Sequence, residues 1–198
     1  MTEARLDAAL LLRAYSAGLF PMAKSREDGR LAWYDPDPRG ILALESFHVP
    51  RRLARTIRQG TFEIRFDTVF DAVIEACAAP RAESPDTWIN ADIRHAYGAL
   101  HRAGHAHSVE CWRDGALAGG LYGVALGGAF FGESMFSRAR DASKVALAAL
   151  CERLKARGFL LLDTQFLTAH LMQFGAIEIP RADYKRLLSA AIALPARF

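Results

Sequence analysis

The chain has 198 residues, of which 52% are hydrophobic and 24% charged, a balance typical of a globular protein with a substantial core. Its length favours one main domain with a small appendage over two full domains. With 25 Lys and Arg against 22 Asp and Glu, the net charge of +3 does not by itself indicate a nucleic-acid-binding protein. That function must be argued from where the basic residues cluster.

The three cysteines, Cys77, Cys111 and Cys151, are widely spaced and mostly in apolar surroundings. They predict reduced, mostly buried thiols, as in a cytosolic protein. Residues 1–12 lack the basic region and cleavage site of a signal peptide, and no uncharged apolar stretch is long enough to span a bilayer. We therefore expect a cytoplasmic protein with no membrane partner.

The first third of the chain is predicted to hold two helices and a linker. Apolar residues share one face of a short helix over residues 6–17, which Gly18 ends. Residues 24–40 are rich in Pro, Gly, Asp and Arg and predict a linker into the main domain. Pro50 suits the first turn of a second helix, and a strand follows over residues 62–66.

The middle of the chain predicts an antiparallel meander. Helices are expected over residues 68–78 and 91–103, and strand-like runs over residues 107–113, 116–126 and 129–136. The dipeptides Asp114-Gly115 and Gly127-Gly128 separate these runs and are strong hairpin signals.

The last third predicts a helix over residues 142–156, a short buried strand over 159–162, a helix from Phe166, a strand over 176–179 and a helix from Arg181. A meander, then a helix, then a buried strand is the order of the acetyltransferase-like α+β fold, a mostly antiparallel sheet flanked by helices. We expect a small N-terminal helix and linker segment, residues 1–38, before a catalytic domain, residues 39–198.

Two clusters of polar residues interrupt apolar strands. Glu133 and Ser134 lie in one apolar run. Burial of a carboxylate there costs free energy unless it is hydrogen-bonded, reaches solvent or pairs with an internal Arg. Asp163, Thr164 and Gln165 follow an apolar strand, where functional side chains often face a crevice. Either Asp163 or Thr164 can instead serve as the N-cap of the next helix.

Trp88, in a loop before a helix, can stack on a nucleobase or anchor the core. For His101, His105 and His107 we favour polar roles at a helix end over a metal site, because no Cys or acid completes a familiar ligand set and Gly104 interrupts the helix.

Four arginines fall between Arg51 and Arg58 with no intervening acid, and Arg51, Arg55 and Arg58 share one helix face. Such a face is either solvated or a contact for a phosphate backbone.

Taken in order, motifs spanning nearly the whole chain resemble the leucyl/phenylalanyl-tRNA-protein transferase family. They are Ala14-Tyr15-Ser16-Ala17-Gly18-Leu19-Phe20-Pro21, Trp33-Tyr34-Asp35-Pro36-Asp37-Pro38-Arg39, Thr87-Trp88-Ile89, Gly104-His105-Ala106-His107-Ser108-Val109-Glu110, Gly119-Gly120-Leu121-Tyr122-Gly123, Gly132-Glu133-Ser134-Met135-Phe136-Ser137, Ala142-Ser143-Lys144 and Asp163-Thr164-Gln165.

The resemblance implies transfer of Leu or Phe, with Met a further candidate, from aminoacyl-tRNA to the N-terminal amine of proteins that begin with Lys or Arg. It also implies a monomer that needs no cofactor and no metal, and a role in protein degradation. Asp163 and Gln165 would lie at the reaction centre, with Gln165 near the attacking amine and Asp163 orienting it. Glu133 would bind or align the acceptor.

The resemblance also assigns binding residues. Trp88 matches an adenine-stacking position, and Met22 stands where family members often carry a Trp. The walls of the amino-acid pocket would be Leu121, Met135 and Leu150, and Ser134 is assigned to substrate binding beside Glu133. The residues Arg51, Arg55 and Arg58 match a basic patch for tRNA phosphates.

Two alternatives stay open. An acyl-CoA N-acetyltransferase has the same fold, although the chain lacks the Arg/Gln-x-x-Gly-x-Gly/Ala loop expected of an acetyl-CoA user. A non-catalytic tRNA-binding module is the second.

Overall fold

The computed structural model describes residues 6–80 and 86–198. Its strands are β1 (Phe20–Ala23), β2 (Leu31–Tyr34), β3 (Arg39–Leu42), β4 (Glu63–Phe66), β5 (Ala106–Arg113), β6 (Ala116–Leu126), β7 (Ala129–Ser137), β8 (Leu161–Gln165) and β9 (Ala176–Ile179). Its α-helices are α1 (Ala8–Ser16), α2 (Arg51–Arg58), α3 (Phe70–Cys77), α4 (Ala91–Arg102), α5 (Ala142–Ala156), α6 (Ala169–Met172) and α7 (Arg181–Ile192), and a 3-10 turn, η1, covers Leu44–Ser46.

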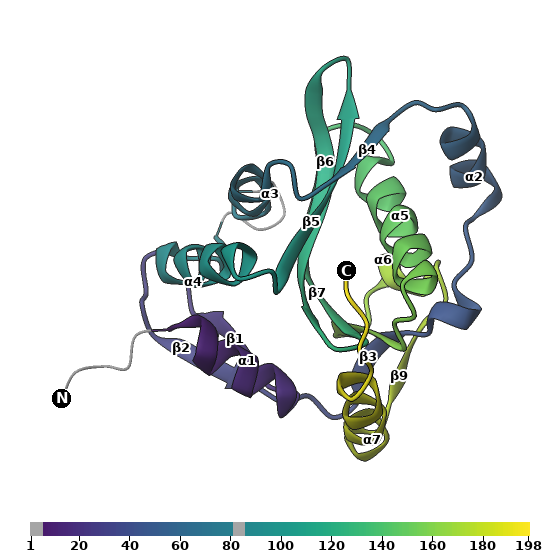
Figure 1. Cartoon of the computed structure of the whole chain (residues 1–198). Helices are drawn as coiled ribbons and strands as arrows, with labels where there is room; N and C mark the ends of the chain where they lie inside the picture. Colours follow the sequence, from purple (N-terminus) through teal and green to yellow (C-terminus); the bar gives the residue numbers. More distant parts are fainter. Residues whose placement is uncertain (1–5, 81–85) are drawn as a thin grey trace.

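Seven strands form the central sheet in the order β4-β5-β6-β7-β8-β3-β9. All neighbours pair antiparallel except β7 and β8, which are parallel because α5 crosses over between them. The predicted α+β fold, with a meander followed by a helix and a buried strand, is confirmed. Helices α3 and α4 cover one face of the β5–β7 region and α5 covers the other (Figure 1).

The core consists of two apolar clusters separated by the sheet. Because side chains alternate along a strand, Leu121 and Phe130 join the cluster under α5, whereas Tyr122 and Phe131 join the cluster under α3 and α4. Burial of each large apolar side chain stabilises the fold by roughly 1.5–3 kcal/mol. The cysteines Cys77, Cys111 and Cys151 are buried and are not in disulfide bonds, as predicted.

The segment predicted as a linker, residues 24–40, is more ordered than expected. It contains β2, which pairs with β1, and its last residues begin β3. Its acids also contact α7: Lys185 Nζ lies 3.0 Å from Asp35 Oδ2, and the backbone N–H of Arg181 donates to Asp37. These long-range contacts, which local sequence does not reveal, hold a proline-rich stretch in place.

The chain around Asp163 also differs from the prediction. Strand β8 runs from Leu161 to Gln165, so Asp163 lies inside the strand, and the next helix begins at Ala169 instead of Phe166. Thr168 caps that helix by accepting the N–H of Leu171, so the N-cap alternative for Asp163 and Thr164 is wrong. Other predicted helices and strands agree with the structure to within two residues.

In the described part of the chain, no helix has the length and apolar character needed to cross a membrane.

Replacement of Gly127 by Ala is expected to destabilise the protein more than replacement of Gly115. Both glycines have a positive φ in a hairpin turn, +55° and +74°, which costs a residue with a Cβ about 1–2 kcal/mol. A Cβ at Gly127 would also lie 2.2 Å from the carbonyl oxygen of Ile192, whereas nothing lies within 4 Å of one at Gly115.

Urea unfolding should therefore show a loss about 1–3 kcal/mol larger for Gly127→Ala than for Gly115→Ala. Equal losses would mean that the contact with Ile192 does not constrain the β6–β7 turn.

Candidate active site

A cavity of about 940 Å³ lies beside the ends of β7 and β8. Its lining comes from β1, α3 and the residues that follow it, β6, β7, α5, β8, α6 and the loop before α4. It includes most of the side chains predicted for binding or catalysis, namely Met22, Trp88, Leu121, Glu133, Ser134, Met135, Leu150 and Gln165. Asp163 and the arginines of α2 are outside this lining. Segments distant in sequence are thus joined at one cavity.

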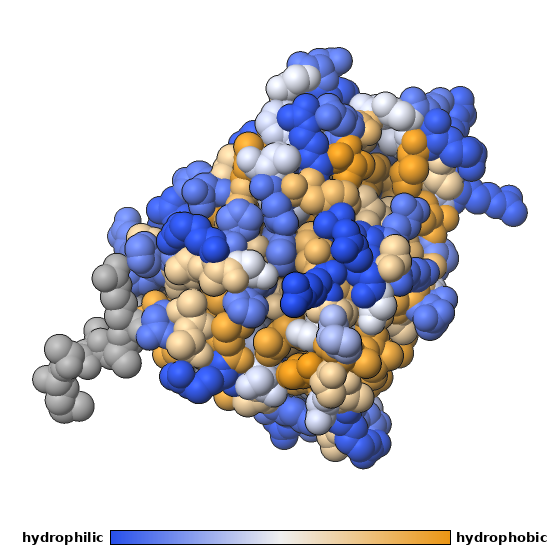
Figure 2. Space-filling view, in the orientation of Figure 1, coloured by the Kyte–Doolittle hydropathy of each residue, from blue (hydrophilic) through white to orange (hydrophobic). Residues whose placement is uncertain are grey.

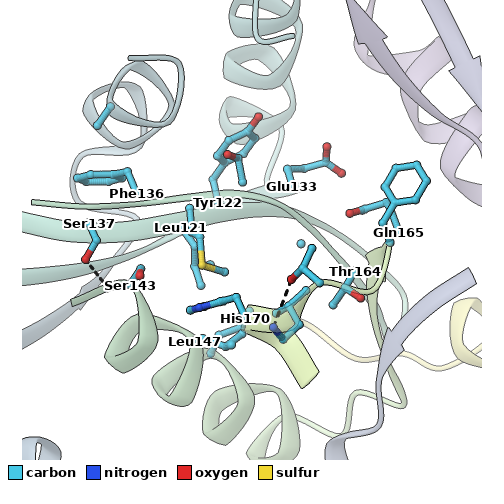
Figure 3. Close-up of a pocket in the computed structure, with 18 of the residues that line it drawn as sticks. Leu121, Tyr122, Glu133, Phe136, Ser137, Ser143, Leu147, Thr164, Gln165 and His170 are labelled. Atoms are coloured by element: carbon cyan, nitrogen blue, oxygen red, sulfur yellow. Dashed lines mark hydrogen bonds between the residues drawn. The ribbon is translucent and has the colours of Figure 1, made fainter. Parts of the chain in front are cut away.

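One end of the cavity is apolar. Leu121 and Met135 approach from the sheet and Leu150 from α5, and the structure adds two walls that sequence analysis missed, Leu147 and Leu162. Figure 3 shows Leu121 and Leu147 on opposite sides of this space. Leu147 could have been found, because it precedes Leu150 by three residues and so shares its helix face.

Trp88 and Met22 line another part of the same cavity. Both also pack partly against the core cluster under α3 and α4, and the backbone N–H of Ala23 donates to the carbonyl of Trp88 over 3.3 Å. Trp88 thus contacts the core and also lines the cavity, and its stacking on a nucleobase stays a prediction.

Glu133 projects into the cavity from β7 and is bound by two tyrosines. The hydroxyls of Tyr15 and Tyr97 donate to its carboxylate over 2.7 and 3.2 Å, and the two hydroxyls also hydrogen-bond to each other. Burial raises the pKa of Glu133 to about 7, although the tyrosine hydrogen bonds oppose this rise. Burial also holds the pKa of both tyrosines well above 10, so they remain donors.

Asp163 is fully buried directly behind Gln165. Its oxygens accept hydrogen bonds from Arg39, from the hydroxyl of Tyr184 at 2.6 Å and from the backbone N–H of Gln165 at 2.9 Å. Only Gln165 of this pair lines the cavity, so the Asp163 side chain is not placed to contact a bound ligand directly. Figure 3 shows the Gln165 side chain in the same region of the cavity as Glu133.

Several buried polar atoms on the cavity wall lack a hydrogen-bond partner within residues 6–80 and 86–198: Tyr122 Oη, Thr164 Oγ1, Gln165 Nε2 and His170 Nε2. Buried polar groups are normally paired. Burial, together with nearby Lys144, lowers the pKa of His170 and keeps its ring neutral. The residues that line the cavity therefore include both apolar side chains and polar groups without a partner in the described residues.

The histidines near the end of α4 make protein contacts. His101 Nδ1 lies 2.8 Å from the carbonyl oxygen of Ala106, and His107 Nδ1 lies 2.8 Å from Asp67 Oδ2. Over the described residues, no group of three or more His, Cys, Asp or Glu is placed to hold a metal ion.

Arg51, Arg55 and Arg58 are exposed on α2, which packs through Leu53 against the cluster under α5. They stay a predicted contact for tRNA.

The sheet order, together with one cavity that joins an apolar chamber to a carboxylate and an amide, is typical of an acyl-transferring enzyme of acetyltransferase-like fold. Among solved structures, the ribosomal-protein-alanine N-acetyltransferase from Brucella melitensis biovar Abortus 2308 is similar at a TM-score of 0.39 and 15% identity, over 57% of this chain and 86% of that chain. A likeness this remote does not bear on function.

Sequence comparison is more specific. The family model described as leucyl/phenylalanyl-tRNA protein transferase matches residues 41–189, and the model of that family's N-terminal domain matches residues 4–37. The leucyl/phenylalanyl-tRNA-protein transferase of Caulobacter vibrioides (strain NA1000 / CB15N) is 61% identical over 188 residues, 95% of this chain and 87% of the relative. That of Phenylobacterium zucineum (strain HLK1) is 60% identical over 195 residues, 98% of this chain and 88% of the relative.

The chain therefore belongs to the leucyl/phenylalanyl-tRNA protein transferase family, and the resemblance found in the sequence is confirmed. It is an aminoacyltransferase that uses aminoacyl-tRNA as a substrate.

Glu133→Gln is expected to change how the free energy of unfolding depends on pH. The pKa of Glu133 is raised from 4.5 to about 7 on folding, so the folded protein favours the neutral carboxyl. The resulting stabilisation is complete below the unfolded pKa and is lost as the pH rises through about 7. The glutamine stays neutral, so the variant should gain stability relative to wild type between about pH 5 and pH 8, on the order of 2 kcal/mol.

Urea unfolding at both pH values measures this change. Glu178→Gln, at an exposed position on β9, is the control and should show no such gain. If Glu133→Gln and Glu178→Gln show the same change in unfolding free energy between the two pH values, the raised pKa of Glu133 is wrong.

Proposed function

We propose that this enzyme transfers Leu or Phe, with Met as a further candidate, from tRNA to the N-terminal amine of proteins that begin with Lys or Arg, and so marks them for degradation. The observation that carries this proposal is a single cavity that holds an apolar chamber, the carboxylate of Glu133 and the side chain of Gln165. We place the reaction in the cytoplasm, where thiols such as the three buried cysteines stay reduced.

The apolar chamber supports the choice of amino acid. Leu121, Leu147, Leu150 and Met135 offer a space that adapts to a branched, aromatic or thioether side chain. These walls provide no hydrogen bond to a polar side chain, which would lose its contacts with water on entry. Discrimination among Leu, Phe and Met then depends on shape and is modest, since one methylene group changes binding by only about 1–3 kcal/mol.

Glu133 supports the choice of acceptor. With a pKa of about 7, a large fraction of this carboxyl is ionised near neutral pH, in a part of the cavity where charge is poorly screened. A carboxylate there favours the cationic side chain of an N-terminal Lys or Arg. A rise in pH through 7 ionises Glu133 and also begins to release the proton from an α-amine, whose ordinary pKa is about 7.7–8.0. Acceptor binding and formation of the neutral nucleophile therefore both favour neutral to mildly alkaline pH.

Gln165 supports a mechanism based on positioning. The acceptor nitrogen attacks the carbonyl carbon of the aminoacyl ester, the bond from that carbon to the ribose oxygen breaks, and a proton passes from the nitrogen to that oxygen. The ester is already activated, so placing the amine against it supplies much of the rate. A side-chain amide is a poor base; Gln165 therefore orients the reacting groups by hydrogen bonding, and Asp163 orients Gln165.

For the nucleotide we propose that Trp88 stacks on the terminal adenine of tRNA, with Met22 as an apolar contact beside it. The α2 arginines then contact tRNA phosphates. In Figure 1 α2 lies at the upper right, and Figure 2 shows that edge of the molecule as mostly hydrophilic.

A panel of peptides that differ only in their first residue tests the acceptor range. With labelled Leu-tRNA as donor, peptides that begin with Arg or Lys should accept leucine at least about tenfold faster than a peptide that begins with Glu, because like charges facing each other in a buried site cost several kcal/mol. Labelled acetyl-CoA is the control donor and should give no product. Equal rates across the panel would exclude acceptor selection by Glu133, and acetyl transfer would favour the acyl-CoA alternative.

Charge reversal on α2 tests the tRNA surface. Arg55→Glu should weaken tRNA binding about tenfold near 0.1 M salt and make the dependence of log K on log salt concentration shallower by about one unit, as expected when one phosphate contact is lost. The matched control is Arg186→Glu, an equal charge change at an exposed position on α7. Filter binding across a salt series measures both effects, and similar losses in the two variants would exclude a specific role for α2.

A further inference from the structure

Arg39 is a fully buried arginine at the start of β3, and all its hydrogen bonds are made within the protein core. Its Nε and Nη2 donate to the two oxygens of Asp163 over 3.0 and 2.7 Å, and its Nη1 donates to the carbonyl oxygen of Gly18 over 2.9 Å. The guanidinium lies between the rings of Phe20 and Tyr184, 4.9 and 4.4 Å from their centroids.

This arrangement leads directly to Gln165. Asp163 Oδ1, which accepts from Arg39 Nε, also accepts the backbone N–H of Gln165 over 2.9 Å. Gln165 has a φ of +60°, a conformation that costs a residue with a side chain about 1–2 kcal/mol unless its surroundings hold it. The Asp163 carboxylate, fixed on its other side by Arg39 and by the hydroxyl of Tyr184, supplies that hold.

We propose that Arg39 and Tyr184 are positioning residues for the transfer reaction, acting through Asp163 to fix where the Gln165 side chain enters the cavity. The inference rests on the role proposed above for Gln165. It gives Asp163 a structural route to the reaction, through the backbone N–H of Gln165, although the carboxylate itself is outside the cavity lining.

Arg39 also fixes a second wall of the cavity. Gly18 and Phe20 belong to the segment that leads into β1, and the Phe20 ring lines the cavity and meets Phe166 edge to face. One planar guanidinium thus sets the end of β8 and the start of β1 relative to each other. A lysine at this position would keep the charge, but its three donors share one nitrogen and could not reproduce the planar arrangement of donors to Asp163 and Gly18.

Loss of a buried ion-pair partner also destabilises a fold, so the test must separate positioning from stability. Tyr184→Phe removes one hydroxyl and keeps the ring over Arg39. Arg39→Lys keeps the charge and removes the planar pair of hydrogen bonds to Asp163.

The matched control is Glu110→Gln, at a buried carboxylate outside the cavity lining. This carboxylate accepts hydrogen bonds from Thr68, Val69, Ser108 and Trp112. Leucine transfer to an Arg-peptide is measured per folded molecule, giving kcat and the KM for Leu-tRNA.

We expect kcat to fall about fivefold in Tyr184→Phe and at least about thirtyfold in Arg39→Lys, because a displacement of about 1 Å at reacting groups can cost a hundredfold. The KM for Leu-tRNA should stay within about twofold of wild type, and Glu110→Gln should keep both constants within the same range. In a Gln165→Ala background, Tyr184→Phe should cause no further loss, since its effect passes through the missing side chain.

The outcomes are distinguishable. If Tyr184→Phe and Arg39→Lys keep wild-type kcat while Gln165→Ala is impaired, the positioning role is wrong and the role of Gln165 stands. The positioning role is also wrong if Tyr184→Phe lowers kcat equally in both backgrounds, or if Glu110→Gln loses as much. Wild-type kcat in Gln165→Ala would overturn the role of Gln165 and this inference with it.

Discussion

The pairing of Arg39 with Asp163 is the constraint on which the rest of the site depends. Two opposite charges with no solvent exposure are stable in a protein only when their remaining hydrogen-bonding capacity is met. Here it is met by groups that must all be in place together, namely the carbonyl of Gly18, the hydroxyl of Tyr184 and the N–H of Gln165. The N-terminal segment, the centre of the sheet and α7 therefore meet at one point beside the cavity.

Glu133 shows how a partly buried acid behaves when hydroxyls, and no cation, are its hydrogen-bond partners in the described residues. Its partners are the neutral hydroxyls of Tyr15 and Tyr97, so burial dominates and brings its pKa to about 7, with Asp163 raising and Arg39 lowering it to a smaller degree. The guanidinium of Arg39 holds Asp163 through hydrogen bonds to both of its oxygens, whereas Glu133, with a pKa of about 7, can exchange a proton near neutral pH. In the proposed mechanism the two carboxylates therefore have different tasks: Asp163 holds the geometry around Gln165, and Glu133 interacts with the acceptor, whose amine also titrates.

The sequence predicted correctly those helices and strands whose ends are set by neighbouring turn and cap residues. The bounds of β6 and α5 agree with expectation to the residue, because Asp114-Gly115, Gly127-Gly128 and Gly158 end regular structure by their own conformational preferences. Strands β1 and β2 were missed, since each is four residues long and is defined by the pairing of Pro21 with Trp33. The position of Asp163 inside β8 was not predictable from neighbouring residues, because its partner Arg39 is 124 positions away. The contacts of Tyr15 and Tyr97 with Glu133 were missed for the same reason, since these tyrosines lie 118 and 36 positions from it.

The chemistry explains why so much buried polarity surrounds a side chain as unreactive as an amide. An aminoacyl ester needs no strong base to react with a neutral amine, but it needs the amine at a defined distance and angle. An amide can supply directional hydrogen bonds at any pH, and its value depends on how firmly it is placed. Gln165 has a strained backbone conformation, and its Nε2 has no partner within the described residues. Its backbone N–H donates to Asp163, whose ion pair with Arg39 is fully hydrogen-bonded. In the proposed mechanism Gln165 and Glu133 therefore have complementary roles, since the amide of Gln165 orients the nucleophile and Glu133, with a pKa of about 7, responds to its charge.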